Sequence, residues 1–308
     1  MKKILGIIAS PRKLGNCEVI VKEISRNVPE EHELKLLRLQ DFDIKACTGC
    51  YRCLYGGKCV LDDDLGTLLE AMCGADAYIV AAPAYFLGAN SSLKSLMDRG
   101  LSFYGVKERL WGKPSIAVAA AGIEGKEGST LLTIQSFLKC LLSDIKTSAV
   151  FSAALPGEIF FDENVLGGNV DRAQPASFKD LGAALFGAAL ERGDPCCPLC
   201  GGDSFRFLGG GKLRCMLCGN EGTLVLRGEE PARDGAPAPE SMPAIEMVLD
   251  IKKGGHDFFL DREAALRHED WLRGMKDRFI AELPKIKAVR ERYKGGDWVK
   301  PRPKDRQD

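Results

Sequence analysis

Four cysteines within thirteen residues are the first side chains in the sequence that could do chemistry: Cys47, Cys50, Cys53 and Cys59. Three of them follow each other at Cys-x2-Cys-x2-Cys spacing, and the fourth comes after five more residues that include Gly56 and Gly57. An iron–sulfur cluster needs thiolates that converge from several directions, which an irregular loop provides and a helix or strand does not. The two glycines can adopt the positive φ that would turn the last cysteine back toward the others. The pattern therefore predicts a [4Fe–4S] cluster in the loop 47–59.

A zinc ion or a pair of disulfides would also use clustered cysteines. Zinc usually takes its ligands from two separated knuckles rather than from a run of three cysteines. Disulfides belong to oxidising compartments, and the apolar run Ile4–Ala9 is too short for a secretory signal and ends at Ser10-Pro11-Arg12. We therefore expect a protein of the reducing cytoplasm, and zinc in this loop stays open as an alternative to iron.

A second cysteine group consists of two Cys-x2-Cys-Gly knuckles separated by fourteen residues: Cys197, Cys200, Cys215 and Cys218. This is the spacing of a zinc ribbon, and the residues between the knuckles favour a small hairpin. We expect a structural zinc, because a metal can fold a unit that is too small for a core of its own. A rubredoxin-like iron in the same four sulfurs is the alternative. Cys196 is expected to be the spare thiol, although it could replace Cys197.

The elements that position these groups alternate between strands and helices. Short apolar runs predict buried strands over residues 3–9, 33–39, 77–82, 114–121 and 147–154. Helical spacing predicts helices after residue 17, from Leu65, and over 91–103, 130–142 and 178–190. This alternation predicts an α/β protein whose parallel sheet has helices on both faces. We expect Asp62, Asp63 and Asp64, just before the second helix, to cap it and to face solvent.

The loop after the first strand has the chemistry of an anion site. It lies between a strand and a helix N-terminus, where free backbone N–H groups and the helix dipole both attract a phosphate. Ser10 and Asn16 add polar groups, and Arg12 and Lys13 add positive charge. The loop matches neither the P-loop nor Gly-x-Gly-x2-Gly, and taken alone it is equally consistent with an ordinary strand–helix connection.

Taken together, these motifs resemble the iron–sulfur flavoproteins, a branch of the NADPH-dependent FMN reductase group. The resemblance covers residues 1–192 and depends on Ser10-Pro11-Arg12-x2-Gly15-Asn16, Cys47-x2-Cys50-x2-Cys53-x5-Cys59, Pro83-Ala84-Tyr85-Phe86, Lys94 and Asp98-Arg99. It implies a flavodoxin-like, doubly wound sheet of five parallel strands in the order 2-1-3-4-5. In such a sheet the loops at the strand C-termini converge on one ligand site.

The resemblance also implies the cofactor contacts. The FMN phosphate would lie on the first loop, at Ser10, Arg12, Lys13, Gly15, Asn16 and Cys17. The isoalloxazine ring would lie against Pro83, Ala84, Tyr85 and Phe86, and the third loop would add Ala121 and Gly122. Cys17 stands where the family usually has a hydroxyl, which weakens one phosphate contact. Members of the family are homo-oligomers, so a homodimer or homotetramer is expected.

The predicted domains are a flavodoxin-like FMN domain (1–192), a zinc ribbon (194–226), a linker (227–243) and a C-terminal helical extension (244–308), in which Pro284 should kink a long helix. The formal net charge is zero, so nothing indicates binding to nucleic acid, and no apolar stretch is long enough to cross a membrane. His256 and His268 are weak candidates for metal ligands.

The sequence thus predicts an oxidoreductase with FMN, a [4Fe–4S] cluster and zinc. Electrons from ferredoxin or NAD(P)H would pass through cluster and flavin to a small-molecule acceptor. No nucleophile, carboxylate pair or triad is evident in the sequence. Two rivals stay open: a redox-responsive docking protein without turnover, and a plain NAD(P)H:FMN or quinone reductase with zinc in the first cysteine loop.

Overall fold

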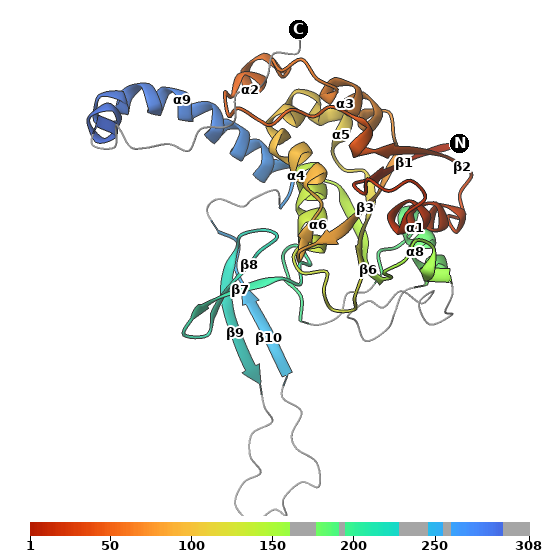
Figure 1. Ribbon diagram of the computed structural model, residues 1–308. Helices are drawn as coiled ribbons and strands as arrows, with labels where there is room; N and C mark the ends of the chain where they lie inside the picture. The colour runs from red at the N-terminus through yellow and green to blue at the C-terminus, as the bar shows by residue number, and fades with distance from the viewer. Residues whose placement is uncertain (161–176, 191–194, 228–245, 255–259, 292–308) are drawn as a thin grey trace, which may run out of the picture. The chain divides into compact units, whose positions relative to one another are not determined.

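The computed structural model describes residues 1–160, 177–190, 195–227, 246–254 and 260–291 (Figure 1). Residues 1–268 form one compact unit, and residues 269–308 form a second. The domain boundaries inferred from the sequence therefore stay a prediction, since the flavodoxin-like part and the ribbon fall within one unit.

The centre of the first unit is a parallel sheet with strands β1 (Lys2–Ile8), β2 (His32–Arg38), β3 (Ala77–Tyr85), β5 (Pro114–Ala121) and β6 (Asp144–Ser152). Their order is β2-β1-β3-β5-β6, which confirms the predicted order 2-1-3-4-5. A sixth strand, β4 (Gly88–Ala89), pairs antiparallel with the end of β3 and was not predicted.

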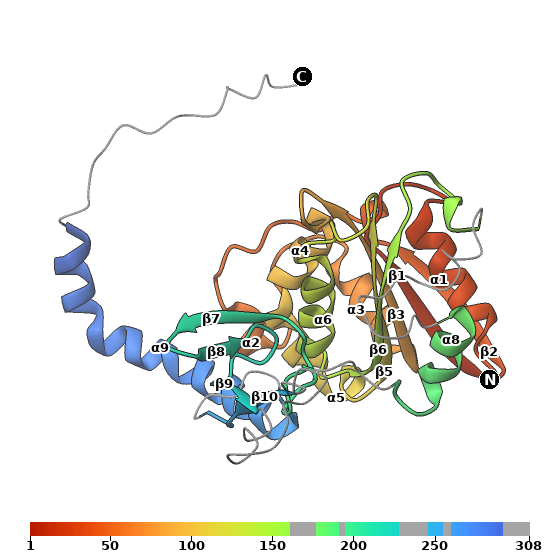
Figure 2. The same cartoon turned by 90° about the horizontal axis from the view of Figure 1, so that it is seen from below.

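Helices cover both faces of this sheet, as Figure 2 shows. One face carries α1 (Asn16–Arg26) and α8 (Phe178–Phe186), and the other carries α3 (Leu65–Cys73), α4 (Ser91–Asp98) and α6 (Thr130–Cys140). Strand β1 shows why both faces are buried: Leu5 and Ile7 belong to one apolar core, and Ile4 and Ile8 to the other. Alternate residues of a strand point to opposite faces, so a continuous apolar run is what a central strand needs.

Shorter elements connect this framework: η1 (Leu39–Asp41), α2 (Arg52–Gly56), η2 (Gly100–Val106), α5 (Lys107–Leu110) and η3 (Glu158–Phe160). The helix predicted over 91–103 ends at Asp98 and continues as the 3-10 helix η2. The cysteine loop 47–59, predicted as wholly irregular, contains the short helix α2.

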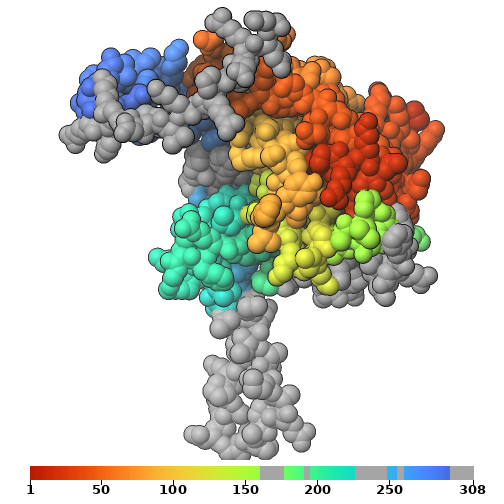
Figure 3. Space-filling view, viewed as in Figure 1, coloured from red at the N-terminus to blue at the C-terminus, as the bar shows by residue number. Residues whose placement is uncertain are grey.

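The second cysteine group lies in a separate antiparallel sheet of β7 (Phe205–Gly209), β8 (Lys212–Cys215), β9 (Glu221–Arg227) and β10 (Glu246–Ile251), in the order β10-β9-β8-β7. Figure 3 shows β7, β8 and β9 in teal. The hairpin of β7 and β8 was predicted. Strand β10 was not, because residues from 244 onward were assigned to a helical extension; it pairs with β9 and so satisfies the backbone groups along that edge. The predicted linker lies, apart from Arg227, outside the described residues.

The predicted C-terminal helix is α9 (Arg262–Glu291), a single helix with Pro284 inside it, and the kink at Pro284 stays a prediction. No helix in the described part of the chain is both long and apolar enough to cross a membrane.

Candidate functional site

The loop after β1 leads into a helix whose first turn is left uncapped. Gly15 is the N-cap of α1 with an extended backbone, and in the described part of the chain no side chain caps the start of this helix. A Cβ at Gly15 would lie 3.0 Å from the Cβ of Arg12 and 3.3 Å from its carbonyl oxygen, so a larger residue would push on this tight turn. The buried Ser10 hydroxyl accepts from the Arg12 N–H at 3.3 Å. Free N–H groups and the dipole make this terminus suited to an anion.

A buried carboxylate that the sequence did not single out holds this loop in shape. Glu18 is 5% exposed and accepts hydrogen bonds from Lys22 at 2.7 Å, from Arg38 at 2.7 Å and from the Leu14 N–H at 2.9 Å. Burial alone would raise the pKa of Glu18, but the bonds from Lys22, Leu14 and Arg38 outweigh it and lower the pKa to about 2. Leu14 has a positive φ of 52°, and the Glu18 carboxylate holds its N–H in that conformation.

A cleft of about 160 Å³ opens at the C-terminal ends of the parallel strands, between three loops. Nine predicted cofactor residues line it: Ser10, Arg12, Asn16, Cys17, Pro83, Ala84, Tyr85, Ala121 and Gly122. Three alanines that were not predicted complete the lining: Ala120, Ala153 and Ala154. The predicted residues Lys13, Gly15 and Phe86 belong to the same loops but do not line the cleft. The place of the cleft is the one expected for a ligand site in an open α/β sheet.

Two predicted phosphate residues have more specific roles than the sequence suggested. The Asn16 side chain donates to the Ala153 carbonyl at 3.0 Å and accepts from the Gly157 N–H at 2.8 Å, so it anchors the loop after β6. Its backbone N–H lies in the uncapped first turn of α1. Cys17 is buried, and burial raises the pKa of its thiol to about 12, so the thiol stays neutral and acts at most as a weak donor.

The aromatic loop after β3 is a tight hairpin turn. Phe86 (φ 50°) and Leu87 (φ 62°) form the turn between β3 and β4, in a left-handed conformation that is strained for bulky side chains. Ser129 holds the turn, since its N–H and its hydroxyl donate to the Leu87 carbonyl at 2.8 Å and 3.2 Å. The Phe86 ring is fully exposed, and Tyr85 is half-exposed beside the cleft. The hairpin thus presents exposed aromatic side chains next to the cleft.

The first cysteine loop bends through three left-handed residues: Gly49 (φ 63°), Tyr51 (φ 59°) and Gly57 (φ 71°). The predicted turn at the glycine pair is therefore made by Gly57, while Gly56 ends α2. Cys47 and Cys50 are exposed, and Cys53 and Cys59 are half-buried. The Arg52 N–H, followed by the Thr48 hydroxyl, lowers the pKa of Cys50.

This loop packs closely on η2. A Cβ at Gly105 would lie 2.1 Å from the carbonyl oxygen of Gly57, which is far inside van der Waals contact, so only glycine at 105 lets the loop lie this close. A Cβ at Gly100 in the same 3-10 helix would meet nothing nearer than the Phe103 ring at 3.8 Å.

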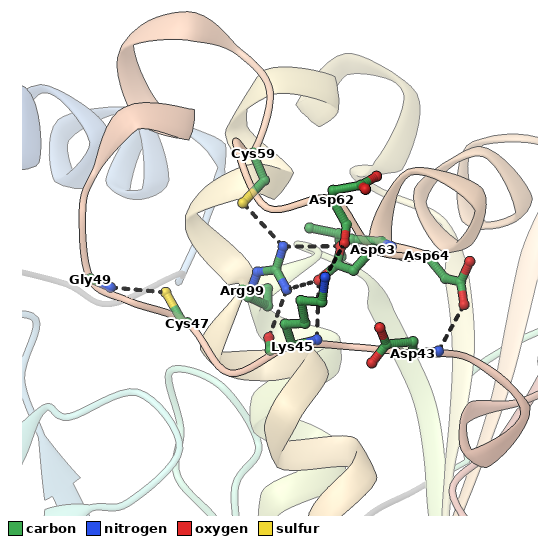
Figure 4. A network of polar contacts seen from close by, with 10 residues as sticks. Asp43, Lys45, Cys47, Gly49, Cys59, Asp62, Asp63, Asp64 and Arg99 are labelled. Carbon is green, nitrogen blue, oxygen red and sulfur yellow. Dashed lines mark hydrogen bonds and ion pairs between the residues drawn. The ribbon is translucent and has the colours of Figure 1, made fainter. Parts of the chain in front are cut away.

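The prediction that the aspartates before α3 cap the helix and face solvent is confirmed in part: Asp62 is exposed, and the Asp63 carboxylate accepts from the Leu65 N–H, the first of α3, at 3.2 Å. It is wrong for the exposure of Asp63. The Asp63 side chain is 1% exposed and forms a buried ion pair with Arg99 (Figure 4). Asp64 is the N-cap of α3 but accepts no hydrogen bond from the helix; its carboxylate instead accepts from the Asp43 N–H at 2.7 Å. The loop folds back over this region, which removes Asp63 from water.

The four ribbon cysteines converge on one point. Their sulfurs all lie within 4.8 Å of one another, with Cys197 and Cys218 3.8 Å apart and Cys200 and Cys215 3.6 Å apart. Four sulfurs about 2.3 Å from a tetrahedral zinc would be separated by about 3.8 Å. Hydrogen bonds among the thiols, the one with Cys197 first, lower the pKa of Cys218 and raise that of Cys200. A bound cation would stabilise all four sulfurs as thiolates, so that none of them would need to keep its proton. The donor set therefore fits a single metal ion.

In the part of the chain that the structure describes, no other group of histidine, cysteine, aspartate or glutamate ligands converges in this way. The sulfurs of the loop 47–59 are therefore more widely spread than ligands of one ion. A cuboidal cluster binds each thiolate to a different iron, so its ligands need not approach each other as closely. Four cysteines on a loop with three left-handed residues provide the donor type that such a cluster needs.

Known proteins are similar to this chain in sequence and in fold. The sequence profile of the family described as NADPH-dependent FMN reductase matches residues 2–152. An iron–sulfur flavoprotein of Methanocaldococcus jannaschii is 34% identical over 139 residues, which are 44% of this chain and 70% of the relative. One of Archaeoglobus fulgidus is 30% identical over 158 residues, 51% of this chain and 71% of the relative. A flavone reductase structure matches the fold with a TM-score of 0.63 at 20% identity, over 97% of this chain and 100% of that one.

Proposed function

This chain belongs to the iron–sulfur flavoprotein family, and from that premise we propose that it uses FMN and a [4Fe–4S] cluster to pass electrons from ferredoxin or NAD(P)H to a small acceptor. The chain is a flavin-dependent oxidoreductase of the NADPH-dependent FMN reductase type. The cluster type, the zinc, the donor and the acceptor are the parts proposed.

The cleft at the sheet edge is the observation that carries the proposal. It joins an uncapped helix N-terminus, with Arg12 on its rim, to the aromatic hairpin of Tyr85 and Phe86. In the described residues no carboxylate pairs with the Arg12 guanidinium, so its charge remains for an anion such as the FMN phosphate. A flat ring would lie on the hairpin. Ligand pockets usually measure about 300–1,000 Å³, so a cleft of about 160 Å³ would enclose the phosphate end and leave the ring at the surface.

Flavin accepts electrons in pairs and releases them singly, whereas an iron–sulfur cluster carries one at a time. The residues of this chain would bind and position both groups. The α1 N-terminus, Ser10 and Arg12 would hold the phosphate, and the strained hairpin would orient the ring. The cysteines at 47, 50, 53 and 59 would hold the cluster. A flavin ring left at the surface would let NAD(P)H stack directly on it, so no dinucleotide motif would be required.

We propose zinc for the ribbon, supported by sulfur separations that match a tetrahedral ion. Cys197 rather than Cys196 belongs to the four-sulfur group. The cytoplasmic location, the homodimer or homotetramer and the predicted domain boundaries remain parts of the proposal.

Anaerobic turnover tests the proposed function. The protein is mixed with NADPH, NADH or reduced ferredoxin and with quinones, oxygen species or other small oxidants, and acceptor reduction is followed. Sustained turnover with at least one donor supports an oxidoreductase. Reversible bleaching of the flavin without turnover would instead support the redox-responsive docking protein. Turnover by a protein that holds zinc and no iron would support the plain NAD(P)H:FMN or quinone reductase.

A further inference from the structure

One buried side chain fastens the cysteine loop at both of its ends. Arg99 is 1% exposed and follows α4, 40 residues beyond Cys59 in the sequence. Figure 4 shows its guanidinium between the chain that enters the loop and the chain that leaves it. Its Nη1 donates to the Lys45 carbonyl at 2.7 Å, and its Nη2 donates to the Cys59 Sγ at 3.1 Å and to the Asp63 carboxylate at 3.3 Å. Its Nη1 also pairs with the second carboxylate oxygen of Asp63.

Asp63 is fixed as firmly as its partner. Its carboxylate also accepts from the backbone N–H groups of Lys45 at 3.1 Å and Leu65 at 3.2 Å. Burial alone would raise its pKa, but the hydrogen bonds, first among them that from Arg99, lower it, so the carboxylate stays charged. The site thus holds one fixed positive charge, one fixed negative charge and a sulfur in contact with the positive one.

Stability alone does not explain this arrangement. The desolvation of a buried ion pair costs about as much as the attraction between its charges returns, and apolar residues would fill the space as well. A guanidinium that donates to a ligand sulfur can tune a metal centre. Hydrogen bonds to the ligand sulfurs and nearby charges both help to set the reduction potential of the centre. Reduction adds an electron to a centre that is already negative, so a nearby cation favours the reduced form.

We propose that Arg99 is a positioning residue for the cluster. Its Nη2 holds the Cys59 sulfur in place as a ligand, and its positive charge favours the reduced form of the cluster. The negative charge of Asp63 partly offsets the positive charge of Arg99 at the cluster. The inference rests on the proposed function, since it requires a cluster in the loop 47–59.

Arginine suits this role because its planar fork serves three acceptors at once, whereas a lysine ammonium is a single point charge. Arg99→Lys therefore keeps the positive charge in the site but loses some of the hydrogen bonds. The lysine ammonium would stay paired with Asp63. Asp63→Asn has the opposite electrostatic effect, because it removes the negative partner and exposes the sulfur to the full charge of Arg99. The two substitutions should move the reduction potential in opposite directions.

The test is a redox titration, monitored by electron paramagnetic resonance, of full-length protein purified without oxygen. Iron and sulfide are counted for each variant. We expect a more negative cluster potential for Arg99→Lys and a more positive one for Asp63→Asn. Arg109→Lys is the matched control, since Arg109 is an exposed arginine paired with Glu70, and its potential should equal that of the wild type.

Shifts of the same sign in the two variants, or no shift beyond that of Arg109→Lys, would overturn the inference, because a purely structural pair has no reason to act with opposite signs. If Arg99→Lys does not accumulate as folded protein, the sign of the Asp63→Asn shift decides. A wild-type protein without iron and sulfide would overturn the proposed function as well. A wild-type cluster whose potential ignores both residues would overturn this inference alone.

Discussion

Replacing Glu18 by glutamine should destabilise the protein by about 2 kcal/mol at neutral pH. The Glu18 carboxylate joins three parts of the structure: Lys22 on its own helix, Arg38 at the end of β2, and the Leu14 N–H in the loop beside the cleft. Glutamine keeps the size of the side chain and one acceptor oxygen, but it loses the charge that attracts both cations.

The magnitude follows from the pKa of this carboxyl, which the structure lowers from its ordinary 4.5 to about 2. At 1.36 kcal/mol per pKa unit this corresponds to about 3 kcal/mol. The Lys22 side chain is 35% exposed, so solvent screens its part, and about 2 kcal/mol is the better expectation.

The sign of the pH dependence follows as well. Because the folded pKa lies below the unfolded one, the stabilisation by Glu18 is complete above about pH 4.5 and is lost as the pH falls toward 2. The difference between the wild type and Glu18→Gln should therefore be largest near neutral pH and shrink across this window. The Leu14 loop should also loosen, so FMN should bind less tightly to the variant.

The assay is urea unfolding of both proteins at several pH values between 7 and 3. Glu33→Gln serves as the control, since Glu33 is 41% exposed and lies 3.7 Å from Lys35, and an exposed pair of this kind contributes about 0.5 kcal/mol or less. A loss for Glu18→Gln no larger than that of the control would refute the argument. So would a loss that stays constant from pH 7 to pH 3.

Three further substitutions test other parts of the account. Gly105→Ala should force the cysteine loop off η2, destabilise it by about 1–3 kcal/mol and lower the iron content, whereas Gly100→Ala should leave the iron unchanged. Cys197→Ser should release the ribbon metal and raise amide exchange in the ribbon sheet, while Cys196→Ser should retain the metal; equal metal loss in both would contradict the assigned ligands. Asn16→Ala should weaken FMN binding about fivefold by freeing the loop after β6, measured by fluorescence titration, and unchanged affinity would argue against that anchor.

The sequence predicted the elements whose burial follows a simple period. The apolar runs of the five parallel strands are buried on both faces, so each run marked a strand and alternation with helices marked the sheet. The ribbon knuckles could be predicted equally well, because Cys-x2-Cys spacing determines which sulfurs converge. In both cases the signal lies within a short stretch of chain.

Contacts between segments that are far apart in the chain could not be predicted from the sequence. Asp63 and Arg99 are 36 residues apart and each looks like a solvated charge until the loop folds over them. Glu18 was one of many helix carboxylates, and only its approach to Arg38 and Leu14 distinguishes it. Strand β10 was missed because its short apolar run, Glu246–Ile251, was assigned to the C-terminal helical extension, and only its pairing with β9 identifies it as a strand. The Phe86–Leu87 turn lacks the Asn-Gly sequence that usually marks such a hairpin.

The most direct test of the central claim counts iron, acid-labile sulfide and FMN in protein purified without oxygen, together with its visible spectrum. We predict about four irons, about four sulfides and about one FMN per chain, with flavin bands above a broad charge-transfer shoulder. Protein that carries flavin but neither iron nor sulfide, or zinc in the loop 47–59 in place of iron, would contradict the proposal that one chain holds both electron carriers.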